Sequence, residues 1–121
     1  MPIKTVLIVD DSPTERHILA QLLLAGGYEV STAESGEEGI ERARQIKPDL
    51  IMMDVVMPGM NGFQATRALS RDEATKGIPV IICTTKAQET DKVWGLRQGA
   101  HDYVTKPVDG PALLAKIAAL G

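Results

Sequence analysis

Five polar residues of this chain stand at or near the ends of short apolar runs, and their types suit one kind of chemistry. They are Asp10, Asp11, Asp54, Thr84 and Lys106. Carboxylates within a few Å of one another repel, and their pKa values rise unless a cation neutralises the shared charge. An ammonium and a hydroxyl beside such a cluster can contact an oxyanion. The set therefore predicts a metal site next to a phosphoryl site, provided that the fold brings the five residues together.

The expected cation is Mg²⁺, because the residues at hand supply only oxygen ligands, and these favour a hard ion that keeps several waters. His17 falls in a predicted helix and His101 in a predicted loop, and both are expected to be solvated rather than to bind metal. Lys106 would act as a point charge on a phosphoryl oxygen, and the hydroxyl of Thr84 could donate to such an oxygen.

Each of these residues also has an ordinary structural interpretation. One aspartate of the Asp10-Asp11 pair could be an extra helix cap, Lys106 a solvated charge, and Thr84 a β-branched strand residue. We prefer the functional interpretation because it explains all five positions at once.

The hydrophobic pattern predicts the elements that position these residues. Continuous apolar runs at 6–9, 50–53 and 80–83 are typical of strands buried on both faces. Residues 28–32 alternate apolar and polar, which indicates a strand at or near an edge, and a last short strand is expected at 102–105. Helical patterns lie between the strands at 12–26, 36–46, 62–70, 87–98 and 111–120.

Two local features refine the helices. Ser12, Pro13 and Glu15 are expected to form a capping box with proline at the first helical position. Trp94, an apolar residue at helical spacing, is expected in the core; if it is instead partly exposed, its helix would offer an anchor for a partner. Gly95 is expected to mark close packing of the same helix.

Strict alternation of strands and helices with short connections predicts an α/β fold, a doubly wound five-stranded parallel sheet in the order 2-1-3-4-5 with helices on both faces. Ligands of such sheets bind beyond the carboxyl ends of the strands, where the strand order reverses. The strands that precede Asp10 and Asp54 would be neighbours at that point. A chain of 121 residues is expected to be one domain, 1–121, with no output domain.

Composition excludes several classes of partner. A net charge of −3 and the lack of a Lys/Arg cluster argue against nucleic-acid binding. No apolar stretch approaches the roughly 20 residues of a membrane span, and we expect neither export nor membrane insertion. The single cysteine, Cys83, lies in an apolar run, and a reducing cytoplasm is the expected location.

Four motifs occur together along the whole chain. They are LIVDDS at 7–12, MDVVMPGMNG at 53–62, Thr84, and YVTKP at 103–107. As a set they resemble the receiver domain of bacterial two-component response regulators, a family with the CheY-like, flavodoxin-like fold. Residues 61–67 (NGFQATR) and 88–95 (QETDKVWG) are similar to stand-alone regulators of twitching motility, of the PilH and PilG type.

The resemblance implies that Asp54 is a phosphoacceptor. The implied Mg²⁺ ligands are Asp10, Asp11, Asp54 and the backbone carbonyl of Val56. Lys106 and Thr84 would contact the acquired phosphoryl group, and the peptide bond between Lys106 and Pro107 would be cis.

The resemblance also implies a switch. The ring of Tyr103 would move inward as Thr84 follows the phosphoryl group. Thr85 stands where the family more often has alanine or another small residue, which bears on that movement. Val56 and Lys86 would flank the phosphoryl group, and we expect them to tune its lifetime.

The expected function is a phosphoacceptor signalling switch that takes a phosphoryl group from a sensor histidine kinase or a phosphotransfer domain. A downstream protein would read the surface formed by 87–98, 102–105 and 111–120, in type IV pilus twitching motility or chemotaxis-like signalling. The protein would be a monomer and not a turnover enzyme.

Three alternatives stay open. The protein could be a phosphate sink in a phosphorelay, or a binding module that is never phosphorylated. It could also be a Mg²⁺-dependent phosphatase with Asp54 as nucleophile, but such an enzyme would normally need a second acid two residues later, where Val56 stands.

Overall fold

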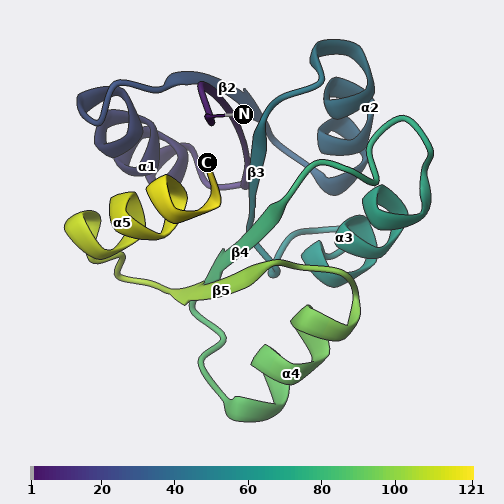
Figure 1. Ribbon diagram of the computed structural model, residues 1–121. Coiled ribbons are helices and arrows are strands. Elements are labelled where there is room, and N and C mark those ends of the chain that lie inside the picture. The colour runs from purple at the N-terminus through teal and green to yellow at the C-terminus, as the bar shows by residue number, and fades with distance from the viewer. Residues whose placement is uncertain (1) are drawn as a thin grey trace.

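Five parallel strands form the centre of the fold in the computed structural model, which describes residues 2–121 (Figure 1). They are β1 (Thr5–Val9), β2 (Glu29–Ala33), β3 (Leu50–Met53), β4 (Val80–Thr84) and β5 (Asp102–Thr105). Their order in the sheet is β2-β1-β3-β4-β5, and every neighbouring pair is parallel. The predicted strand order is confirmed, and the alternating segment forms the edge strand β2 as expected.

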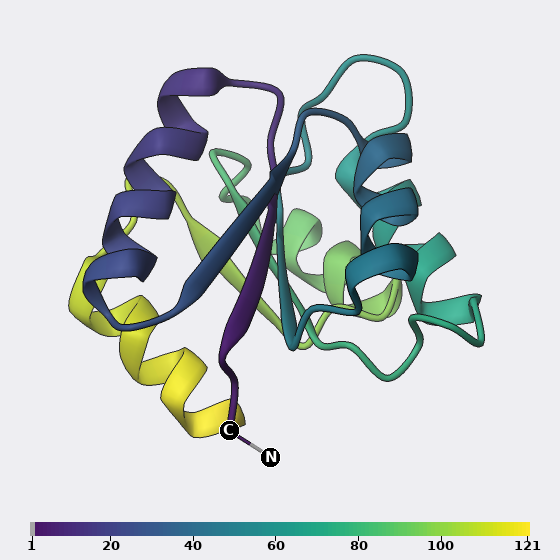
Figure 2. The same cartoon turned by 90° about the horizontal axis from the view of Figure 1, so that it is seen from above.

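Helices cover both faces of the sheet. They are α1 (Pro13–Ala25), α2 (Gly36–Ile46), α3 (Gly62–Arg71), α4 (Glu89–Arg97) and α5 (Gly110–Leu120). Figure 2 shows α1 and α5 on one face and α2, α3 and α4 on the other. The doubly wound α/β class is therefore confirmed. Within residues 2–121, no helix combines the length and the apolar character needed to cross a bilayer.

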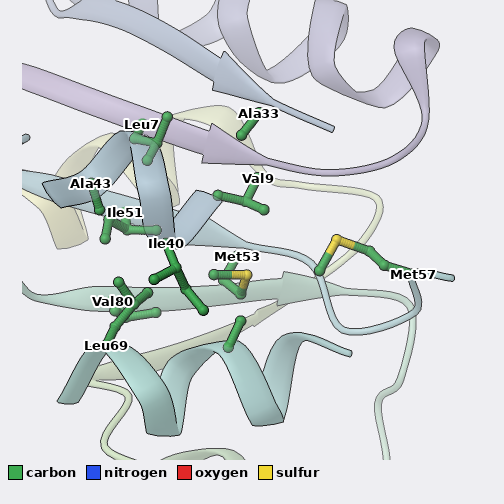
Figure 3. Packing of buried hydrophobic residues seen from close by; sticks show 11 residues of the cluster. Leu7, Val9, Ala33, Ile40, Ala43, Ile51, Met53, Met57, Leu69 and Val80 are labelled. Carbon is green, nitrogen blue, oxygen red and sulfur yellow. The ribbon is translucent and has the colours of Figure 1, made fainter. Parts of the chain in front are cut away.

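The two covered faces explain why the central strands carry no polar side. Leu7 of β1 lies in one hydrophobic cluster with Ile40 of α2 and Leu69 of α3 (Figure 3). Ile8, the next residue, points to the opposite face and packs in a cluster with Leu23 of α1. Because each face needs its own apolar layer, the strand reads as an uninterrupted apolar run.

The prediction that Trp94 lies in the core is wrong, because its side chain is half exposed. Gly95 makes the contact with the sheet instead: a Cβ there would lie 2.8 Å from Ile82 Cδ1 and 3.0 Å from the ring of Tyr103. Residues i and i+1 of a helix do not share a face, so the approach of Gly95 to the sheet turns Trp94 outward. The expected close packing of Gly95 is confirmed.

Candidate functional site

The five predicted site residues lie at one end of the sheet, the edge formed by the carboxyl ends of the strands. All strands are parallel, so their carboxyl ends meet there. The register pairs the last residues of β1 and β3, which makes Asp10 and Asp54, directly after them, neighbours. Thr84 ends β4, and Lys106 follows the last residue of β5, which pairs with Thr84.

Three carboxylates converge at this edge. Asp10, Asp11 and Asp54 each offer an oxygen that lies within 4.8 Å of the others. Asp10 and Asp54 are buried, whereas Asp11 is exposed. The cluster is therefore closed on the protein side and open to solvent at Asp11.

The ammonium of Lys106 lies beside the same carboxylates. Its Nζ donates to Asp10 Oδ2 at 2.6 Å and stands 4.0 Å from Asp54 Oδ2. Burial alone would lower the pKa of Lys106, but the hydrogen bond to Asp10 and the charges of Asp54 and Asp10 outweigh it, so the pKa lies above its usual value. Lys106 therefore stays a cation, with its side chain only 10% exposed, and it partly offsets the three negative charges.

The surroundings of Asp54 disfavour its ionised form. Its Oδ1 accepts the amide of Val55 at 2.8 Å. Burial, and then the charge of Asp10, raise the pKa of Asp54, while Lys106 and the Val55 amide act against that rise. A cation or an electrophile that neutralises this carboxylate would therefore be bound favourably.

The family model described as response regulator receiver domain matches residues 6–118 of the chain. The chain belongs to this family.

Known relatives agree with the assignment. Protein PilH of Pseudomonas aeruginosa is 61% identical to the receiver over 115 residues, which cover 95% of each chain. The phosphate regulon transcriptional regulatory protein PhoB of the same organism is 42% identical, and the alignment covers 97% of the receiver but 51% of PhoB. The structure of the chemotaxis protein CheY4 of Vibrio cholerae superposes with a TM-score of 0.90 at 33% identity, covering 98% of the receiver and 99% of CheY4.

The ring of Tyr103, which was expected to move inward with the phosphoryl group, already lies inward in this structure. The ring is buried, and the Tyr103 hydroxyl donates to the carbonyl oxygen of Lys86 at 2.7 Å. Burial, with the charges of Asp91 and Asp54, raises the pKa of Tyr103 to about 12, so the phenol remains a donor at neutral pH.

The two residues expected to tune the lifetime of the phosphoryl group lie as follows. The Lys86 ammonium stands 3.8 Å from Asp91 Oδ1. The side chain of Val56 projects into solvent, with 59% of its surface exposed.

The predicted capping box of α1 is only half formed. Ser12 Oγ accepts the amide of Glu15 at 3.3 Å, as a cap should. The Ser12 amide, however, donates to Asp10 Oδ1 at 2.9 Å, which fills the place that Glu15 would take in a full box. The Glu15 carboxylate instead lies 3.7 Å from Lys106 Nζ. The peptide bond between Lys106 and Pro107 is cis, as expected.

Two residues near the site were missed in the sequence. Arg16 Nη1 donates to the carbonyl oxygen of Asp10 at 2.8 Å, and Nη2 stands 3.4 Å from Glu34 Oε1. Arg16 thus fixes the end of β1, and Glu15 contacts the lysine of the site. Their place in the first turn of the helix after Asp10-Asp11 was a usable signal, because a helix that starts at a strand end faces the same edge of the sheet.

The raised pKa of Asp54 leads to a pH-dependent prediction for the Mg²⁺-free receiver. The folded state binds a proton at Asp54 more tightly than the unfolded state does, so the ionised carboxylate lowers the free energy of unfolding at pH values above the folded pKa. We expect an Asp54→Asn protein to melt at a higher temperature than wild type at pH 7. The difference should shrink as the pH falls through the raised pKa.

Asp49 provides a matched control of opposite sign. Its pKa is lowered, first by the amides of Lys4 and Thr5. Its ionised form therefore adds stability above the unfolded pKa, and this is lost as the pH falls through the folded pKa. Asp49→Asn should lower the melting temperature at pH 7. Thermal melts from pH 7 downward measure the change in melting temperature of each variant. A change of the same sign in both variants would contradict the opposite pKa shifts of Asp54 and Asp49.

Proposed function

We propose that this receiver is a signalling switch in which Asp54 accepts a phosphoryl group from a phosphohistidine of a sensor histidine kinase or a phosphotransfer domain. The observation that carries the proposal is the placement of the Asp54 carboxylate, buried among Asp10, Asp11 and the Lys106 ammonium at the open edge of the sheet. Phosphoryl transfer depends mainly on positioning and on neutralising charge, and these residues provide both.

Mg²⁺ is the metal that fits this site. The cluster supplies carboxylate oxygens alone, and the exposed Asp11 leaves room for the waters that this ion retains. Asp10, Asp11, Asp54 and the carbonyl of Val56 would hold it. When bound, the ion would neutralise phosphoryl oxygens that the carboxylates alone would repel.

The receiver's own groups would carry the rest of the transfer. An oxygen of Asp54 forms the new bond to phosphorus while the bond from phosphorus to the donor imidazole nitrogen breaks, and the imidazole leaves. Oδ1 of Asp54 is held by the Val55 amide, and Oδ2 faces Lys106. The Lys106 ammonium and the Thr84 hydroxyl would then bind phosphoryl oxygens.

The signal would leave the site through Thr84 and Tyr103. A shift of Thr84 toward the phosphoryl group moves the segment whose carbonyl, at Lys86, accepts the Tyr103 hydroxyl. This would bias the surface of α4, β5 and α5, which a separate protein reads. The half-exposed Trp94 supports that choice, since tryptophan is enriched in binding hot spots.

We place the switch in type IV pilus twitching motility or chemotaxis-like signalling. The identity with PilH over 95% of both chains supports this, together with the resemblance of residues 61–67 and 88–95 to twitching-motility regulators. The proposal takes the receiver to be a cytoplasmic monomer, and the unpaired, buried thiol of Cys83 suits a reducing compartment.

Incubation with acetyl phosphate and Mg²⁺ tests the proposal against its rivals. The expected result is one phosphoryl group per protein molecule, with slow loss. Continued turnover of a phosphate ester would support a phosphatase, and no reaction would support a binding module. A phosphate sink would gain the phosphoryl group but would show no change in amide exchange over α4, β5 and α5.

The phosphoryl group is expected to be long-lived. Hydrolysis needs a water in line behind the phosphorus, and the apolar Val56 offers that water no hydrogen bond. Lys86 adds a positive charge that can pair with phosphoryl oxygens. A Val56→Asn, Lys86→Glu protein should lose its phosphoryl group roughly 5- to 10-fold faster, which is the worth of one or two hydrogen bonds.

The control is Val93→Asn, which places the same amide on α4, where Val93 is also exposed. It should decay at the wild-type rate. Decay is followed by intact mass after removal of the donor. Equal or slower decay of the double variant would contradict the role of Val56 and Lys86.

A further inference from the structure

Glu15 does not make the capping hydrogen bond that its position in α1 predicts. At the third helical position it would normally accept the amide of the capping residue. In this receiver the Ser12 amide donates to Asp10 Oδ1 instead. The Glu15 carboxylate, with 43% of its side chain exposed, faces Lys106 across 3.7 Å.

Lys106 therefore lies among three carboxylates. Its Nζ is 2.6 Å from Asp10 Oδ2, 3.7 Å from Glu15 Oε2 and 4.0 Å from Asp54 Oδ2. The lysine side chain is 10% exposed, so its ammonium depends on these partners rather than on water. Of the three, Glu15 is the partner nearest to solvent.

Both oxygens of Asp10 are already engaged. Oδ1 accepts the Ser12 amide and Oδ2 accepts Lys106. A metal ion at the aspartate cluster needs an Asp10 oxygen, and it repels an ammonium on the same carboxylate. Metal binding must weaken the contact between Lys106 and Asp10. A buried cation that loses its partner is strongly disfavoured unless another anion replaces it.

We propose that Glu15 is a positioning residue: it takes over the Lys106 ammonium when Mg²⁺ occupies Asp10, and it thereby favours metal binding. The inference rests on the proposed function, because it assumes that the aspartate cluster binds Mg²⁺. It adds a residue outside the predicted site. The carboxylate of Glu15 needs no new contact for this, since it already faces Lys106 from the solvent side.

The test is a double-mutant cycle read by Mg²⁺ titration calorimetry in the absence of any phosphodonor. Glu15→Gln should weaken Mg²⁺ binding about two- to fivefold, as expected for a partly exposed ion pair. In a Lys106→Met background the same change should have only the effect of removing a distant charge. Glu37→Gln, on an exposed residue in the first turn of α2, measures that effect.

Two outcomes would overturn the inference. In the first, Glu15→Gln reduces the Mg²⁺ affinity no more than Glu37→Gln does; in the second, it reduces that affinity equally in the wild-type and Lys106→Met backgrounds. Thermal melts of each variant would check that it is folded. If wild type is phosphorylated on Asp54 with Mg²⁺ while Glu15→Gln binds the metal normally, only the inference fails. If wild type binds no Mg²⁺, the inference and the metal part of the proposed function fail together.

Discussion

Replacement of Asp11 with alanine is expected to weaken Mg²⁺ binding on the order of 100-fold and to stop phosphorylation by acetyl phosphate. Loss of an outer-sphere partner of a metal already costs 10- to about 100-fold, and Asp11 would be a direct ligand. The metal-free protein should melt no lower than wild type, because removing one of three clustered carboxylates relieves repulsion. Calorimetry and thermal melts measure the two effects.

Glu37→Ala is the matched control, since it removes one exposed carboxylate from the first turn of α2, outside the aspartate cluster. It should bind Mg²⁺ and accept a phosphoryl group as wild type does. Unchanged metal affinity in the Asp11 variant would refute the ligand assignment. A large drop in its melting temperature would show a structural role instead.

Replacement of Gly62 with alanine is expected to cost about 3 kcal/mol or more of the free energy of unfolding, the upper end for overpacking. A Cβ at this position would overlap the backbone carbonyl oxygen of Asp54, and backbone atoms cannot move aside as a flexible side chain can. The Gly62 amide also donates to the carbonyl of Val55. The clash would therefore displace Asp54 itself, and phosphorylation should slow as well.

Gly77→Ala is the control, because a Cβ there would have no neighbour within 4 Å. Its free energy of unfolding should stay within roughly 0.5 kcal/mol of wild type, as is usual for surface positions. Urea denaturation compares the two. Similar losses at both glycines would mean that the approach of Gly62 to Asp54 is not what requires glycine.

Much of the fold follows from the apolar runs. Residues 50–53 are apolar at every position because the sheet is covered on both faces, and residues 28–32 alternate because β2 lies at the edge. Once the strands are parallel, Asp10, Asp54 and Lys106 must meet at one edge. This part of the site needs no tertiary detail, only the strand order.

Contacts that depend on competition between partners could not be predicted. Glu15 has the spacing of a capping box, and only the structure shows that Asp10 takes the Ser12 amide and leaves Glu15 to Lys106. Trp94 has the spacing of a core residue, but the next residue, Gly95, makes the close approach of the helix to the sheet. Trp94 is therefore turned toward solvent. Local patterns do not rank such alternatives, because tertiary packing decides between them.

The central claim is that Asp54 carries the phosphoryl group. The most direct measurement is mass spectrometry of the intact protein and its peptides after incubation with acetyl phosphate and Mg²⁺. We expect the mass of a single phosphoryl group, stable to mild acid and labile to base, on the peptide that contains Asp54, and none on an Asp54→Ala protein. The same addition to the Asp54→Ala protein, or its location on another peptide of wild type, would contradict the claim.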